Sequence, residues 1–432
     1  MTTPPSGPFP RCDVPAVHAS IAPSDVLQRE RRGLYQLAAE LLVPDSPQAL
    51  DPDVIDSPLS RHQIGDALAG RTRLRCSTLV GISALAATDS GTQGPRAVSR
   101  PEANTLLAEA LETIGVELGR QQAAGRQPEL LTEANGERFT TALAVLRDGV
   151  ALARSVSSEL IEDLLPHVAL VGIIDPQRAG RLASASPRTF PGLVLLKGPD
   201  SAIEVVEALV HEGAHQKLFD LAITRDLLNA DSDRCPPFHP PWAPNEHRWP
   251  LEQALAAWHA YACLAWFAHD AGVMAGERAV GTGSLLPVAH ERSKLLGQWL
   301  LDKGDYLGSD AHTLLNGLIG RRPRTARTTA TCSGAVATDY TVDTRLEFRR
   351  CGSSDRVLVG RPSQPPQLYW VSNDAAALLE LLGQQSLDEV YHAFAQRWGV
   401  QRLEATHHLT TMLADLSMSG LVTTRGTKAT SQ

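Results

Sequence analysis

Apolar side chains recur at three- and four-residue intervals over much of residues 24–185, which is the spacing of amphipathic helices. The clearest helices are predicted at residues 34–42, 101–122 and 136–156. Residues 87–100 are rich in Gly, Pro and Ser and predict a loop. This part of the chain is therefore expected to form a helical shell.

The pattern changes at residues 191–198, PGLVLLKG, a short apolar run bounded by Pro and Gly that predicts a strand. Helical spacing resumes directly afterwards, with apolar side chains at Ile203, Val206, Val210, Ala214 and Leu218. Asp200 and Ser201 are candidate N-caps, and Glu204 follows Ser201 by three residues, as in a capping box. Another helix is predicted at residues 251–270, with an inward stripe of Leu251, Leu255, His259, Ala262 and Trp266.

The chain changes character again near residue 320. A basic stretch with few large apolar residues predicts a linker, and strands are then predicted at 338–350, 355–360 and 367–372, before three short helices and a last strand within 419–424. The expected fold class is mainly α with a small sheet. The expected segments are a disordered lead-in (1–23), a helical domain (24–320), the linker (321–337), a small α+β domain (338–424) and a tail (425–432).

Composition limits the classes of function. The 432 residues are 43% hydrophobic and 20% charged, which is ordinary for a globular protein, and the net charge of −8 argues against a general nucleic-acid binder. No apolar run approaches the ~20 residues needed to span a bilayer, and the N-terminus lacks the basic start and apolar core of a secretory signal. The six cysteines form no C-x-x-C pair, so we expect them to be reduced, in the cytoplasm and unrelated to metal.

Residues 211–215 read His-Glu-Gly-Ala-His, an H-E-x-x-H motif inside the helix predicted after residue 201. Residues four apart lie on the same helix face, so His211 and His215 would present two imidazoles to one metal ion. The alternative is a pair of partly buried histidines that make ordinary hydrogen bonds. A third ligand is needed for a catalytic metal, and His259 is the best candidate because it lies on the inward stripe of the second helix. Glu252 and His239 are the next candidates.

Three segments carry a resemblance to a known family: AIEVVEALVHEGAHQKLFDL (202–221), the Pro- and Trp-rich loop ending in HRWP (247–250), and AAWHAYACLAWF (256–267). Together they resemble the HExxH-motif peptide-modification proteins, over roughly residues 24–320. The resemblance implies an iron(II)- and 2-oxoglutarate-dependent oxygenase that hydroxylates a side-chain β-carbon of a ribosomally synthesised precursor peptide. It also implies a zincin-like metal helix.

The resemblance assigns residues to roles. It implies that His211, His215 and His259 bind the metal, and that Arg248 binds a carboxylate of 2-oxoglutarate. Arg292, in a helix that begins near residue 290, is the next choice for this contact. The family's loop usually has an Arg where this chain has Ala243, so the contacts to the cosubstrate differ here.

The C-terminal segment 338–424 resembles the PqqD-like, winged-helix-like domains that recognise the leaders of precursor peptides. The resemblance implies that a leader peptide adds a strand to the edge of a sheet. The alternative is a DNA-binding winged helix, although its candidate recognition helix, about 403–418, has few cations and two acids.

Two other functions stay open beside the oxygenase. In a zinc peptidase that processes the precursor peptide, Glu212 would activate a metal-bound water. In the oxygenase Glu212 would instead orient a bound water or a metal ligand. The third possibility is a non-catalytic peptide-binding protein.

Overall fold

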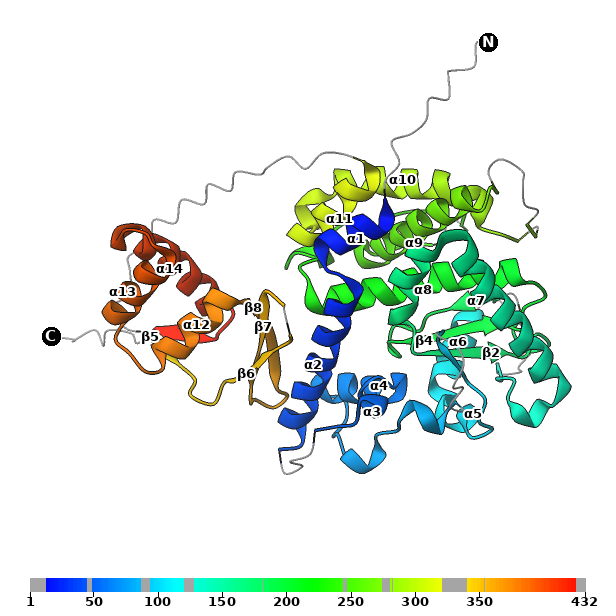
Figure 1. Cartoon of the computed structure of the whole chain (residues 1–432), viewed down its shortest axis with the longest axis horizontal. Helices are drawn as coiled ribbons and strands as arrows, with labels where there is room; N and C mark the ends of the chain where they lie inside the picture. The colour runs from blue at the N-terminus through cyan, green and yellow to red at the C-terminus, as the bar shows by residue number, and fades with distance from the viewer. Residues whose placement is uncertain are drawn as a thin grey trace, which may run out of the picture. The chain divides into compact units, whose positions relative to one another are not determined.

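The computed structural model describes residues 13–44, 49–86, 94–119, 128–180, 182–243, 247–273, 280–281, 283–320, 340–352 and 354–424. The chain is mainly helical with small sheets, as the sequence predicts (Figure 1). It forms two compact units. Unit 1 takes its described residues from Met1–Arg32, Leu50–Gly65 and Arg75–Arg324, and unit 2 from Gly33–Ala49, Asp66–Leu74 and Thr325–Gln432.

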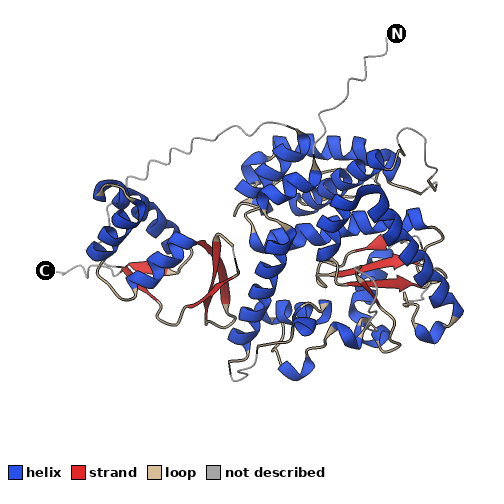
Figure 2. Ribbon diagram, viewed as in Figure 1, coloured by secondary structure: helices blue, strands red, loops and turns tan. Residues whose placement is uncertain are grey.

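Unit 1 contains a four-stranded sheet with the order β1-β2-β4-β3. Strands are red in Figure 2. Its strands are β1 (Arg96–Ala97), β2 (Leu170–Ile174), β3 (Ser184–Ala185) and β4 (Leu193–Lys197). β2 is parallel to both β1 and β4, whereas the short edge strand β3 is antiparallel to β4. All five residues of β2 are buried, which explains why its sequence lacks the alternation of a half-exposed strand. β4 is the strand predicted at residues 191–198, whereas β2 was not predicted.

The helices of unit 1 supply most of the residues of its largest hydrophobic core. They are α1 (Val14–Ile21), α2 (Ser24–Leu42, shared with unit 2), α3 (Pro52–Ile55), α4 (Pro58–Leu68, also shared), α5 (Ala103–Leu106), α6 (Ala108–Gly119), α7 (Glu137–Leu164), α8 (Ala202–Thr224), α9 (Leu251–Asp270), α10 (Ala289–Asp302) and α11 (Ser309–Ile319). α8 packs against α7 and α9, and also against β3 and β4. α7 approaches α8 closely, because a Cβ at Gly149 would lie 2.4 Å from the Cβ of Val205.

α1 corrects the prediction of a disordered lead-in at residues 1–23. The carboxylate of Asp13 accepts a hydrogen bond from the Ala16 amide at 3.0 Å, and Pro15 stands in the first turn, so the helix has a normal start. Val14 and His18, four residues apart, are buried. The lead-in prediction is therefore wrong over Val14–Ile21, while residues 1–12, the linker and the tail lie outside the described residues.

Unit 2 combines two small sheets with three helices. One sheet has the order β6-β7-β8 and the other pairs β5 with β9. The elements are β5 (Tyr340–Val342), β6 (Glu347–Arg350), β7 (Arg356–Arg361), β8 (Gln367–Ser372), α12 (Asn373–Leu382), α13 (Leu387–Trp398), α14 (Arg402–Met418) and β9 (Val422–Thr424). The single strand predicted at 338–350 is thus two strands in its described part.

Part of α2 belongs to unit 2, which the sequence analysis did not anticipate. Glu40 of α2 pairs with Arg349 of β6 at 2.5 Å, and a Cβ at Gly360 of β7 would lie 2.6 Å from a methyl of Leu41. The structural unit around residues 340–424 therefore includes sequence from near the N-terminus. Among the helices that the structure describes, none is long and apolar enough to cross a membrane.

Candidate metal centre

The two motif histidines lie side by side on α8. The Nε2 atoms of His211 and His215 are 3.2 Å apart, and the two rings meet edge to face. α8 begins after Ser201, but the Ser201 side chain makes no capping hydrogen bond, and Glu204 accepts from the Asp200 amide instead. The predicted helix is therefore present, while its predicted capping box is not.

The spacing of these imidazoles suits a metal ion. An ion 2.0–2.1 Å from both Nε2 atoms, the usual zinc–nitrogen distance, would see them about 100–105° apart across their 3.2 Å separation. The buried Nδ1 atom of His211 has no hydrogen-bond partner among the described residues. Burial, and then the neighbouring His211, hold the pKa of His215 well below its usual range, so this ring is neutral, the form that binds metal.

Glu212 is fixed by the edge of the sheet. Its carboxylate accepts a hydrogen bond at 2.6 Å from the hydroxyl of Ser184 on β3, and its backbone carbonyl accepts one from Ser186 at 3.3 Å. The side chain is 3% exposed. These bonds fasten the motif turn of α8 to β3.

A cavity of about 400 Å³ opens beside His211. Its wall includes Ser184, Glu207 and Ala208, together with Ser284 and Leu285. Glu207 lies one helical turn before His211, and its carboxylate accepts hydrogen bonds from the Ser284 hydroxyl and from the Leu285 amide. The cavity therefore gives a small molecule access to one side of the motif.

Arg292 lies beside the motif through Tyr261. The Tyr261 ring centroid is 6.1 Å from that of His211, and Arg292 donates a hydrogen bond to the Tyr261 hydroxyl at 2.8 Å. The guanidinium also lies over the Trp242 ring, 4.8 Å from its centroid. Arg248 is exposed, and no contact of this kind joins it to the motif within the described part of the chain.

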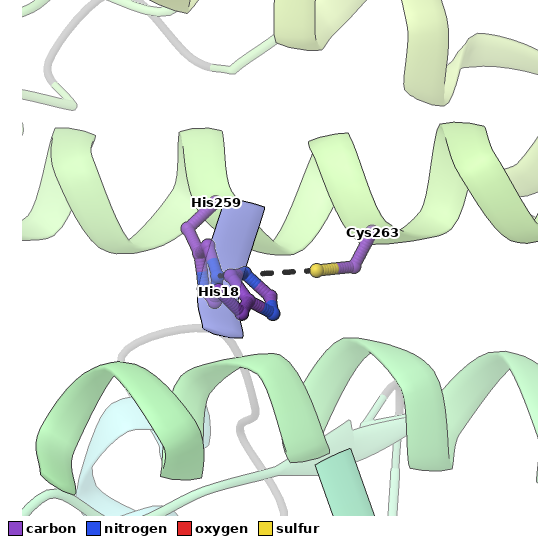
Figure 3. Close-up of side chains that lie close together, drawn as sticks. All are labelled: His18, His259 and Cys263. Carbon is purple, nitrogen blue, oxygen red and sulfur yellow. Dashed lines mark hydrogen bonds between the residues drawn. The ribbon is translucent and has the colours of Figure 1, made fainter. Parts of the chain in front are cut away.

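His259 is inward, as predicted, and its ring nitrogens contact Ala214 and His18. Its Nδ1 donates to the backbone carbonyl of Ala214 at 3.0 Å, and its Nε2 lies 2.7 Å from the Nε2 of His18 (Figure 3). Within unit 1, three ligand atoms that lie within 4.8 Å of one another come from His18, His259 and Cys263. The structure thus pairs His211 with His215, and joint coordination by these two and His259 stays a prediction. Of the other two candidates, Glu252 pairs with exposed Arg188 and His239 is itself exposed.

Buried charges lie behind α8. The Asp163 carboxylate accepts from Nδ1 of His18 at 2.6 Å and also from the Lys217 ammonium, whose side chain is 0% exposed. Burial alone would raise the pKa of Asp163, but the hydrogen bond from His18 and the charge of Lys217 hold it well below its usual range. The roles of these residues were not predicted from the sequence, although a lysine and an aspartate within apolar helices are a usable signal of buried pairing.

Unit 2 has a groove of about 790 Å³ between β8 and α14. The wall on one side is Tyr369–Ser372, and on the other side it includes His408, Met412 and Asp415. β8 pairs with β7 on one side only, and its other edge has no strand partner among the described residues. This arrangement could accept an extended peptide.

Comparison with known proteins adds no relative. No family model matches the sequence, and no curated protein matches it. The geometry of the site and the resemblance of its motifs therefore carry the functional proposal.

Proposed function

We propose that the chain is an iron(II)- and 2-oxoglutarate-dependent oxygenase that hydroxylates a side-chain β-carbon of a ribosomally synthesised precursor peptide. The observation that carries this proposal is the pair of facing imidazoles, His211 and His215, with Arg292 held beside them by Tyr261 and Trp242. The resemblance of the motifs supplies the class of reaction.

The chain's own residues would hold the reactants. His211 and His215 would bind the ion, and nitrogen ligands suit iron(II) as they suit zinc. When bound, iron(II) and 2-oxoglutarate supply the oxidising chemistry. Arg292 is the better candidate for the carboxylate of 2-oxoglutarate, because an arginine fork binds a carboxylate with direction and because aromatic rings already hold this side chain near His211.

Glu212 would orient the two metal-binding imidazoles. Its hydrogen bond from Ser184 sets the rotation of α8 against β3, and so sets the direction of the two imidazoles. In this role the carboxylate exchanges no proton with the substrate.

One observation favours a zinc peptidase as the second candidate. Glu212 stands in the motif position of the water-activating base, and the neighbouring strand β3 lies at an edge of the sheet, where an extended peptide could pair. The two reactions differ in product, since an oxygenase adds one oxygen atom to the peptide and a peptidase gives two fragments.

We propose that the leader binds unit 2. The open edge of β8 and the apolar groove wall support strand addition, in which backbone hydrogen bonds give affinity and pockets select side chains. The absence of lysine and arginine after Arg402 in α14 argues against DNA binding by this helix. A non-catalytic role would leave the bound peptide unchanged.

The test is reconstitution of the full chain with iron(II) without air, followed by 2-oxoglutarate, air and the precursor peptide. Mass spectrometry should find a gain of one oxygen that needs both iron and 2-oxoglutarate, with succinate formed. His211→Ala should abolish the gain, and Arg248→Ala should spare it. Two peptide fragments made with zinc would support the peptidase instead, and an unchanged peptide under all conditions would refute both enzymes.

A further inference from the structure

The protonation of the buried pair His18 and His259 follows from their outer hydrogen bonds. Nδ1 of His18 faces the Asp163 carboxylate, which can only accept, so this nitrogen carries a hydrogen. Nδ1 of His259 faces the Ala214 carbonyl, which also can only accept, so it carries a hydrogen as well. In a neutral imidazole the second nitrogen is then bare. Both Nε2 atoms therefore present lone pairs.

These two lone pairs point at each other across 2.7 Å. Two bare nitrogens repel at this distance, so a proton or a metal cation must lie on them. Both rings are 0% exposed, so no solvent reaches the gap between them.

A thiol lies on the same side as the lone pairs. The Sγ atom of Cys263, one helical turn after His259, is 3.9 Å from its Nε2 (Figure 3). Two imidazoles and one thiolate form a donor set that borderline transition metals such as zinc prefer. The carboxylate behind His18 completes the usual carboxylate–histidine–metal arrangement.

We propose that His18, His259 and Cys263 bind a transition-metal ion of the zinc class, separate from the ion proposed at His211 and His215. The site joins α1 to α9, and its burial gives it a structural role. This assignment does not rest on the oxygenase. It differs from two expectations drawn from the sequence. Those were that the cysteines are unrelated to metal and that His259 is the third ligand of the motif site. One nitrogen lone pair binds one ion, so Nε2 of His259 cannot serve both sites.

The geometry needs a small adjustment on binding. An ion 2.0–2.1 Å from both Nε2 atoms would see them about 80–85° apart at their present 2.7 Å separation. Opening this separation to the 3.2 Å of the motif pair requires a movement of 0.5 Å. The negative charges of the thiolate and of Asp163 offset part of the positive charge of the ion and of Lys217, which pairs with Asp163. This lowers the free-energy cost of burying the site.

The test uses cobalt(II) with the full chain after metals have been removed by a chelator. Cobalt bound by a thiolate gives a charge-transfer absorption in the near-ultraviolet, which the two motif histidines alone do not produce. The wild type should show this band, and so should the His211→Ala/His215→Ala double variant. Cys263→Ser should lose it, while Cys235→Ser, a matched change at another buried cysteine of unit 1, should keep it.

A second measurement supports the first. Zinc bound per chain, counted by native mass spectrometry, should fall by one ion in Cys263→Ser, and Asp163→Asn should weaken this zinc by roughly 10–100-fold. Wild-type protein that shows no thiolate band at saturating cobalt overturns the proposal whatever the variants do, and leaves a shared proton between the rings. A band that survives Cys263→Ser overturns it as well. Loss of oxygenase activity with the band intact would sink the proposed function alone.

Discussion

Lys217 gives the sharpest test of how the back of α8 is stabilised. Its ammonium is fully buried and donates to the Asp163 carboxylate, which is 11% exposed, and to the Ser24 hydroxyl at 3.0 Å. Lys217→Met keeps the apolar stem and removes the charge. The carboxylate then remains buried with less compensation, although it retains the hydrogen bonds from His18 and Ser24.

The expected loss follows from this environment. Removal of one partner of a buried ion pair costs about 3–5 kcal/mol, and the two remaining hydrogen bonds to Asp163 place Lys217→Met near the lower end. Asp163→Asn leaves the ammonium buried and should cost a similar amount. The double variant buries neither charge, so its loss should be roughly 2 kcal/mol smaller than the sum of the two single losses.

The suitable assay is hydrogen exchange of α8 amides in metal-free protein, because it reports the opening of unit 1 alone. A global unfolding curve could mix the transitions of the two units. The matched control is Arg29→Met, which breaks an exposed pair with Asp25 and should change the opening free energy by no more than about 0.5 kcal/mol. If Lys217→Met opens α8 no more readily than this control, or if the single losses simply add, the ion pair is not coupled in the way described.

Four further outcomes are expected. Gly149→Ala should lower the free energy of opening of α8 by about 1–3 kcal/mol in the same hydrogen-exchange assay, because the new methyl meets Val205. Acid should destabilise unit 1. Burial lowers the pKa of His167, so as the pH falls below about 6.5 the unfolded chain takes up this proton before the folded chain does, and the free energy of opening of α8 should fall. Arg292→Met should raise the KM for 2-oxoglutarate by roughly 10–100-fold, because a charge-assisted hydrogen bond to its carboxylate is lost. Zinc binding should be unchanged, since Arg292 donates to Tyr261 and is not a metal ligand. Met412→Glu should weaken leader binding to the full chain, measured by fluorescence anisotropy, and unchanged affinity would move the leader elsewhere.

The local pattern of apolar residues predicts most helices and strands, but it does not predict which elements pack against one another. The helix predicted at 251–270 has the bounds of α9, and His259 is inward as its apolar stripe predicts. The nitrogen that faces His259, however, belongs to His18 of α1, a segment that was predicted to be disordered. α1 was not predicted because the segment is short and the sequence around it is rich in Pro. Its apolar face is buried by α9 and α11, which lie far away in the sequence.

The strand β2 was missed for a different reason. Its sequence, LVGII, is apolar at every position, and a short continuous apolar run does not distinguish a buried parallel strand from part of a buried helix. The contribution of α2 to unit 2 was equally hidden, since an amphipathic pattern shows that a face is buried but not what buries it.

The position of α1 has a consequence for synthesis of the chain. Val17 of α1 packs against α11 at Gly317, and His18 meets a partner that lies 241 residues further along the chain. At ordinary rates of translation of 5–20 residues per second, roughly 10–50 s pass before that partner is made. α1 therefore leaves the ribosome long before its partners on α9 and α11, and until these are made its apolar face is exposed for a chaperone to bind.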